Sequence, residues 1–92
     1  MTPGEGVHLV RDEGLAWQQV GDESVVLDLR SSLYYSGNAP GTVLWSRLVE
    51  GATTEQLVEA LTAEFDVEPG RARADVLAFL EELRARGLLE GG

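Results

Sequence analysis

The spacing of apolar residues along this 92-residue chain changes near Gly37. Before Gly37, short runs alternate apolar and polar residues, which is typical of strands with one buried face. After it, apolar residues recur at every third or fourth position, which is typical of amphipathic helices. A block of strands followed by a block of helices indicates an α+β domain, with the helices on one side of a small antiparallel sheet.

The first block predicts three or four short strands. Val25, Leu27 and Leu29 alternate with Val26 and Asp28, the pattern of a strand with one buried face. The next segment is rich in aromatic residues, which strands favour, so the two segments together predict a β-hairpin. The predicted strands are residues 7–10, 15–20, 24–29 and 33–36.

The second block predicts three helices with recognisable start and stop signals. Asn38 suits an N-cap, with Pro40 in the first turn. Thr53 followed three residues later by Gln56 matches a capping box. Gly87 stands where a left-handed residue ends a helix. The predicted helices run from Asn38 to Gly51, from Thr53 to about Asp66, and from Pro69 to Gly87.

The last helix has an unusually wide apolar face. Val76, Phe79, Leu80 and Leu83 form one stripe, and Leu77 falls about 100° round from Val76. A face of this width can contact the core on one flank and a second structure on the other.

Composition and charge restrict the class of protein. The chain has 16 acidic residues against seven arginines and no lysine, a net charge of −9, which opposes nucleic-acid binding. It has no cysteine, no apolar run of the ~18 residues that a membrane span needs, and no signal-peptide pattern. We therefore expect a single cytoplasmic domain over residues 1–92, with residues 1–6 as a flexible lead.

The residue types that usually carry catalysis are poorly placed for it. His8 is the only histidine and lies in a candidate edge strand, where a surface histidine is the ordinary outcome. Most acidic residues lie on the predicted solvent faces of helices, and no serine has a visible base partner. Glycine-rich phosphate loops are absent from the sequence. The sequence thus predicts no catalytic residue, no metal site and no cofactor, and therefore no enzyme.

Two other features favour binding. Alternation sends Tyr34 and Tyr35 to opposite faces of the last strand, so one is expected in the core and the other exposed beside the sheet edge. Arg71 and Arg73 lie in the first turns of the last helix, where the helix dipole disfavours cations. Arg71 can pair with Asp75 four residues later. The alternative is that both arginines face an acidic segment of a partner.

Several motifs follow one another over most of the chain. They are Val26-Leu27-Asp28-Leu29 with Tyr34-Tyr35, Asn38-x-x-Gly41 with Trp45, Gly51-x-Thr53 with Leu57, and Asp75-Val76-x-x-Phe79-Leu80-x-x-Leu83-x-x-x-Gly87-Leu88-Leu89. In this order and spacing they resemble the PqqD-like proteins, the recognition elements for ribosomally made, modified peptides (RiPPs). Among these, the chain is most similar to the free-standing members of lasso-peptide biosynthesis. Gly37 and Pro40 stand where the family usually has leucine and threonine.

The resemblance implies a winged helix-turn-helix-like fold, with a three-stranded antiparallel sheet followed by three helices. It also implies that the protein captures the leader of a precursor peptide, which adds as a strand to the sheet edge and packs against the last helix. The implied partners are a cysteine-protease-like leader peptidase and an ATP-dependent cyclase, with no nucleic acid and no membrane. The residues expected to bind the peptide are Leu33, Tyr34, Tyr35, Ser36, Arg71, Ala72, Asp75, Val76, Phe79 and Leu83.

Two questions stay open at this stage. One is which flank of the last helix faces the peptide, and we expect the flank of Ala72, Asp75, Phe79 and Arg86 rather than that of Arg73, Leu77 and Arg84. The other is function, because the same fold class includes winged-helix DNA-binding regulators and purely structural subunits. A regulator should present several lysines or arginines to DNA, which this acidic chain does not favour.

Overall fold

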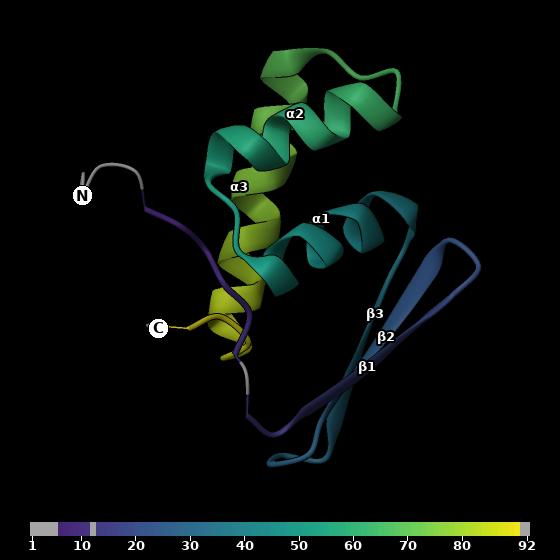
Figure 1. Cartoon of the computed structure of the whole chain (residues 1–92), viewed down its shortest axis with the longest axis vertical. Helices are drawn as coiled ribbons and strands as arrows, with labels where there is room; N and C mark the ends of the chain where they lie inside the picture. The colour runs from purple at the N-terminus through teal and green to yellow at the C-terminus, as the bar shows by residue number, and fades with distance from the viewer. Residues whose placement is uncertain (1–5, 12, 91–92) are drawn as a thin grey trace.

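The computed structural model describes residues 6–11 and 13–90, and it has the expected order of strands and then helices (Figure 1). The three-stranded sheet and three helices of the α+β expectation are confirmed. The first five residues of the expected flexible lead lie outside the described residues. The elements are β1 (Leu15–Val20), β2 (Glu23–Asp28), β3 (Leu33–Gly37), α1 (Ala39–Glu50), α2 (Thr54–Glu64) and α3 (Pro69–Ala85).

The strands form an antiparallel meander in the order β1-β2-β3, which confirms the predicted hairpin. Helix α1 covers one face of the sheet, and α3 packs mainly against α2 (Figure 1). The register places Trp17, Val26 and Tyr35 side by side on the covered face. Three large side chains in one row give α1 an apolar surface to pack against.

The buried face of β2 is the one that carries fewer large apolar residues. Val26 and Ser24 are 1% exposed, whereas Val25 and Leu27 are 42% and 39% exposed. Their neighbours in the register decide this, because the face of Val26 also carries Trp17 and Tyr35. The opposite face of the sheet is consequently apolar and open.

The core lies between the sheet and the three helices. Trp45 of α1 packs edge-on against Trp17 of β1, with ring centroids 6.2 Å apart and planes at 72°. Burial of these apolar side chains is the main favourable term in folding. The largest side chains with less than 2% exposure are Trp45, Leu48, Leu57, Leu83, Val26, Val76 and Ser24.

The predicted helix ends are confirmed in detail. The Asn38 side chain accepts a hydrogen bond from the Gly41 N–H at 3.1 Å. Thr53 and Gln56 form the reciprocal capping box, with distances of 2.9 Å and 3.1 Å. Gly87 has a φ of +73° and follows the end of α3, a conformation that glycine adopts without strain.

The segment 7–10 is not a strand of the sheet, so that prediction was wrong. It is extended, and His8 exchanges backbone hydrogen bonds of 2.7 Å and 2.9 Å with Ala52, between α1 and α2. Val10 forms a bridge with Leu89 near the other end of the chain and is 8% exposed. The segment is therefore extended and buries one large side chain without joining the sheet.

Gly37 permits a close approach between the sheet and α1. The Thr42 hydroxyl donates to Ser24 Oγ at 3.0 Å, and both residues are buried. A Cβ on Gly37 would lie 3.0 Å from Ser24 Oγ, a very tight contact. A larger side chain at this position, such as leucine, would therefore require this buried polar pair to move.

Candidate functional site

Strand β3 is an edge of the sheet, and among the described residues no strand pairs with its outer side. Its sequence, LYYSG, has neither a charge nor a proline to discourage a further strand. Leu33 and Tyr34 are 68% and 69% exposed. An unpaired strand of this kind is a template for an extended peptide.

A pocket of about 350 Å³ lies between this edge strand and the C-terminal end of α3. Its walls are mostly apolar, with a few polar groups at the rim, as in many ligand sites. The space exists because α1 covers the sheet while α3 packs mainly against α2. The pocket is lined by Val26, Asp28, Ser31, Leu33, Tyr34, Tyr35, Ala85, Arg86 and Leu88.

Tyr35 connects the strand to α3. Its ring lies 6.4 Å from that of Phe79, with the planes tilted by 57°, and the Arg86 guanidinium sits 4.9 Å from the Tyr35 ring centroid. Arg86 also pairs with Glu82 at 3.0 Å. Burial and the Glu82 carboxylate raise the pKa of Tyr35, and Arg86 opposes them in part. Tyr35 therefore keeps its proton near neutral pH and its hydroxyl can donate a hydrogen bond.

Asp28 forms the polar end of the pocket. Its carboxylate accepts hydrogen bonds from Arg11 at 2.7 Å and from the Arg30 N–H at 3.0 Å. Burial by itself raises the pKa of Asp28, but the hydrogen bonds from Arg30, Arg11 and Ser31 outweigh it and lower the pKa overall. Arg11 also donates to the Gly87 carbonyl at 2.7 Å. The network thus ties β2 to the end of α3 and fixes one end of the pocket.

The lowered pKa of Asp28 predicts a specific acid sensitivity. A carboxyl whose folded-state pKa lies below its unfolded value of about 4 stabilises the protein above that value, and this stability is lost as the pH falls through the folded-state pKa. Urea unfolding followed from pH 6 to pH 2.5 should show this loss in the wild type and a shallower one in Asp28→Asn. Identical pH profiles would contradict the assignment.

The predicted split between the two tyrosines is confirmed. Tyr34 points to the open face of the sheet, and Tyr35 is half-buried against the core. Leu33, Tyr34 and Tyr35 all line the pocket, as expected for a shared site, and Ser36 follows them on β3. Phe79 joins them through its contact with Tyr35.

The remaining expected site residues lie elsewhere on α3. Ala72, Val76 and Leu83 are fully buried in the core, so their side chains support the helix from behind. Arg71 and Asp75 form an exposed ion pair of 3.5 Å near the start of α3, at the far end of the helix from the pocket.

Several residues that line the pocket were not among the residues expected from the sequence to bind the peptide. Arg86 follows Phe79 by seven residues, or two helical turns, so the sequence places both residues on the same flank of α3. Arg86 was expected on that flank but was not among the expected peptide-binding residues. Asp28 and Ser31 come from β2 and the turn after it. No local signal marks those two, because only the fold brings them to α3.

Each arginine of α3 and its C-cap lies within ion-pair distance of a carboxylate. Arg71 forms the expected ion pair with Asp75, four residues later in the same helix. Arg73 pairs with Glu55 of α2. Two further pairs stand nearer the C-terminal end: Arg84 with Glu81 and Arg86 with Glu82. A helix whose cations are matched by acids offers little to the phosphates of DNA.

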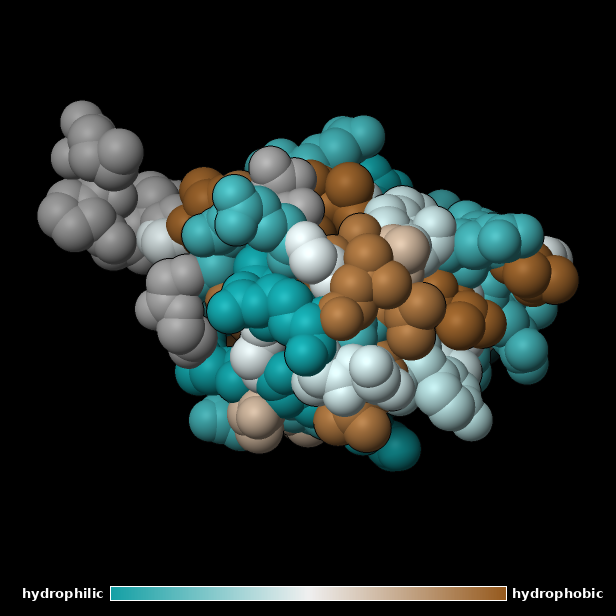
Figure 2. All heavy atoms as spheres, turned by 90° about the horizontal axis from the view of Figure 1, so that it is seen from below, coloured by the Kyte–Doolittle hydropathy of each residue, from teal (hydrophilic) through white to brown (hydrophobic). Residues whose placement is uncertain are grey.

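Apolar surface is concentrated on the sheet side of the molecule. Seen from below, apolar side chains form a contiguous group surrounded by hydrophilic ones (Figure 2). The large side chains at least 36% exposed on β2, β3 and the turn between them are Val25, Leu27, Leu29, Leu33 and Tyr34. Apolar surface of this extent on a small domain indicates contact with other molecules.

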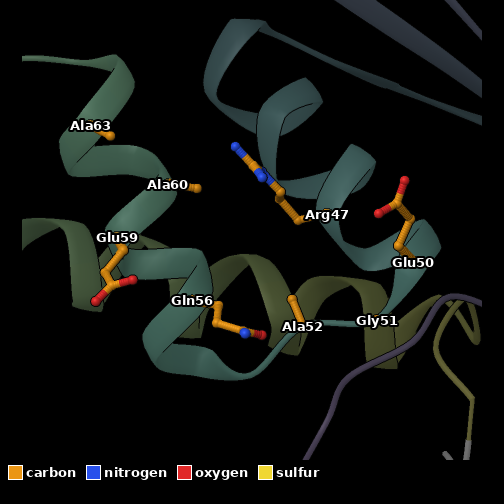
Figure 3. Close-up of a pocket in the computed structure, with 8 residues that line it drawn as sticks. All are labelled: Arg47, Glu50, Gly51, Ala52, Gln56, Glu59, Ala60 and Ala63. Atoms are coloured by element: carbon orange, nitrogen blue, oxygen red, sulfur yellow. The ribbon is translucent and has the colours of Figure 1, made fainter.

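A depression of about 340 Å³ between α1 and α2 has a different character. Arg47 extends from α1 toward α2, Gln56 points into the space, and the Glu59 carboxylate turns away (Figure 3). Its lining is polar and mixed in charge, without a chemical group that suggests a reaction. Within residues 6–11 and 13–90 no cluster of metal-ligating side chains occurs, and no helix is long and apolar enough to cross a membrane.

The open edge of β3 and the apolar pocket beside it together form a site that an extended peptide could occupy. This combination defines a small peptide-binding domain. The family model of coenzyme PQQ synthesis protein D (PqqD) matches residues 23–89, so the chain belongs to the PqqD family. The resemblance to PqqD-like recognition elements is thereby confirmed.

Two solved structures share this fold. TbiB1 in complex with the TbiA(beta) leader peptide is 33% identical, has a TM-score of 0.80, and matches over 88% of this chain and 94% of that chain. A lasso peptide synthetase B1 complexed with the leader peptide is 27% identical, has a TM-score of 0.78, and matches over 89% and 95%. No curated protein sequence matches the chain.

Proposed function

We propose that this protein binds the leader segment of a ribosomally synthesised precursor peptide, of the lasso class, as an added strand on β3. The observation that carries the proposal is the open edge of β3 beside the pocket formed with the end of α3. Both similar structures are complexes with a leader peptide, which supports the same role here.

Binding by strand addition divides the work between backbone and side chains. Backbone hydrogen bonds along Leu33–Ser36 supply affinity for any extended segment, and the pocket selects the side chains that enter it. Phe79 and Arg86 present the α3 flank that faces Tyr35, and Arg71 and Asp75 extend that flank toward the start of the helix. The fully buried residues of α3 hold the helix at the distance that leaves the groove open.

The bound leader would be presented to a separate leader peptidase and to an ATP-dependent cyclase. Holding the precursor beside these enzymes raises its local concentration without any bond chemistry by this chain. A disordered leader loses conformational entropy when it binds, so its affinity should depend on a few anchors.

A fluorescence-anisotropy titration tests this function. The probe is a labelled peptide with the leader sequence of the precursor encoded beside this protein, and the parallel probe is a labelled DNA duplex of similar mass. We expect saturable leader binding with a Kd near or below micromolar and no DNA binding, because α3 has its cations paired with acids. Binding of the duplex, or no binding of the leader, would reject the proposal.

A further inference from the structure

Strand β1 is the second open edge of the sheet. It pairs with β2 on one side, and in the described part of the chain no strand lies on its other side. Natural edge strands are usually protected by lysine, proline or a bulge. β1 reads LAWQQV, with none of these residues, and its register with β2 runs from Leu15 to Val20 without a bulge. This edge is therefore as receptive to an added strand as β3.

A hollow of about 460 Å³ lies beneath this edge, between β1, α1 and the extended segment 9–11. Leu15, Trp17 and Val49 give it apolar walls, and Trp45 also lines it. Trp45 is 1% exposed, and its indole N–H has no hydrogen-bond acceptor among the described residues.

The opposite face of the sheet is also apolar beside β1. Ala16, Gln18 and Val20 point to that face and, with Val25 and Leu27 of β2, line a shallow hollow of about 370 Å³. Val20 is 60% exposed. A strand added to β1 would therefore find apolar contacts for the side chains on both of its faces.

The acidic residues around β1 favour a bound segment that carries basic residues. Glu13 precedes the strand, Asp22 and Glu23 follow its end, and Glu90 lines the hollow; all four are exposed. Arg11, the cation of the hollow, is already paired with Asp28. A second copy of the chain fits poorly, because antiparallel pairing of two β1 strands would bring Glu13 of one copy to Asp22 and Glu23 of the other.

We propose that β1 is a second strand-addition site, which takes an extended apolar segment with basic flanks from the leader peptidase that receives the bound leader. This inference rests on the proposed function and assigns its two tasks to the two edges of one sheet. β3 holds the leader, and β1 holds the enzyme. Both ligands extend the same sheet, so they can bind together without competing.

The test uses the full chain labelled with ¹⁵N, saturated with the leader peptide and titrated with the purified leader peptidase. We expect amide chemical-shift changes concentrated in 15–20. In the double variant Ala16→Lys/Gln18→Lys the peptidase Kd should rise at least tenfold, while the leader Kd stays within twofold of the wild type. Ala63→Lys/Ala74→Lys adds the same charge at exposed helix positions and should leave both constants unchanged.

Several results would overturn this inference. They are shifts confined to other elements, an equal effect of the two lysine pairs, a dimer through β1 seen by light scattering, or leader binding without any peptidase binding. If the leader itself fails to bind, the proposed function falls, and a peptidase titration without leader then decides the role of β1 separately.

Discussion

Replacing Phe79 with alanine is expected to weaken leader binding about 30-fold, a loss of about 2 kcal/mol. The Phe79 ring packs against Tyr35 on the pocket wall, with centroids 6.4 Å apart. It also lies close to Gly41, where an added Cβ would stand 3.5 Å from the ring, so it bridges α3, α1 and β3. Without the ring, the groove loses an apolar wall and Tyr35 loses the neighbour that orients it. Anisotropy titration with the leader peptide measures the effect.

Leu77→Ala is the matched control for Phe79→Ala. Leu77 lies on the same helix, is 51% exposed and belongs to the other flank, so its removal should leave the leader Kd within twofold of the wild type. Thermal unfolding of both variants identifies any general loss of stability. An unchanged Kd in a folded Phe79→Ala protein would contradict the assignment of this flank to the leader.

Replacing Trp45 with alanine should have the largest effect on stability, about 3–5 kcal/mol. Trp45 is 1% exposed, contacts Trp17 and belongs to the core between the sheet and the helices. Domains of this size are stable by only about 5–15 kcal/mol, so much of the margin would be lost. We expect the Tm to fall by more than about 15 °C in a thermal unfolding scan.

Trp45→Phe separates packing from hydrogen bonding at this position. The phenyl ring is smaller and leaves some empty volume, which destabilises the fold. It also removes a buried N–H that has no acceptor among the described residues, and such a group costs about 1–3 kcal/mol. The two effects oppose each other, so the free energy of unfolding in urea should change by less than about 1.5 kcal/mol. A loss as large as that of alanine would show that the N–H has an acceptor.

Local signals predicted the helices and strands and most of their boundaries. The Asn38 cap, the Thr53 and Gln56 capping box and the left-handed Gly87 depend on interactions within a few residues, so they could be recognised without the fold. The prediction of a strand at 7–10 was wrong because a short apolar segment that buries one side chain outside the sheet resembles a short strand in sequence.

The sequence predicted the location of the candidate site, between the β3 edge and α3, but not all of the residues that line it. Tyr34 and Tyr35 were assigned to opposite faces by alternation alone, which is a local property. The contact of Arg86 with Tyr35 and the network from Arg11 through Asp28 to Gly87 join residues far apart in sequence. No local pattern contains such pairings, because they depend on how the helices pack on the sheet.

The α+β order, the helix caps, the acidic charge and the wide apolar face of α3 follow from the sequence alone, because propensity, periodicity and composition act locally. Which face of the sheet is buried, in contrast, depends on the tertiary fold. Val25, Val26 and Leu27 are all apolar, and the register with Trp17 and Tyr35 turns Val26 inward. The tertiary structure also decided that two edges stay open beside apolar hollows, since this depends on where α1 and α3 lie against the sheet.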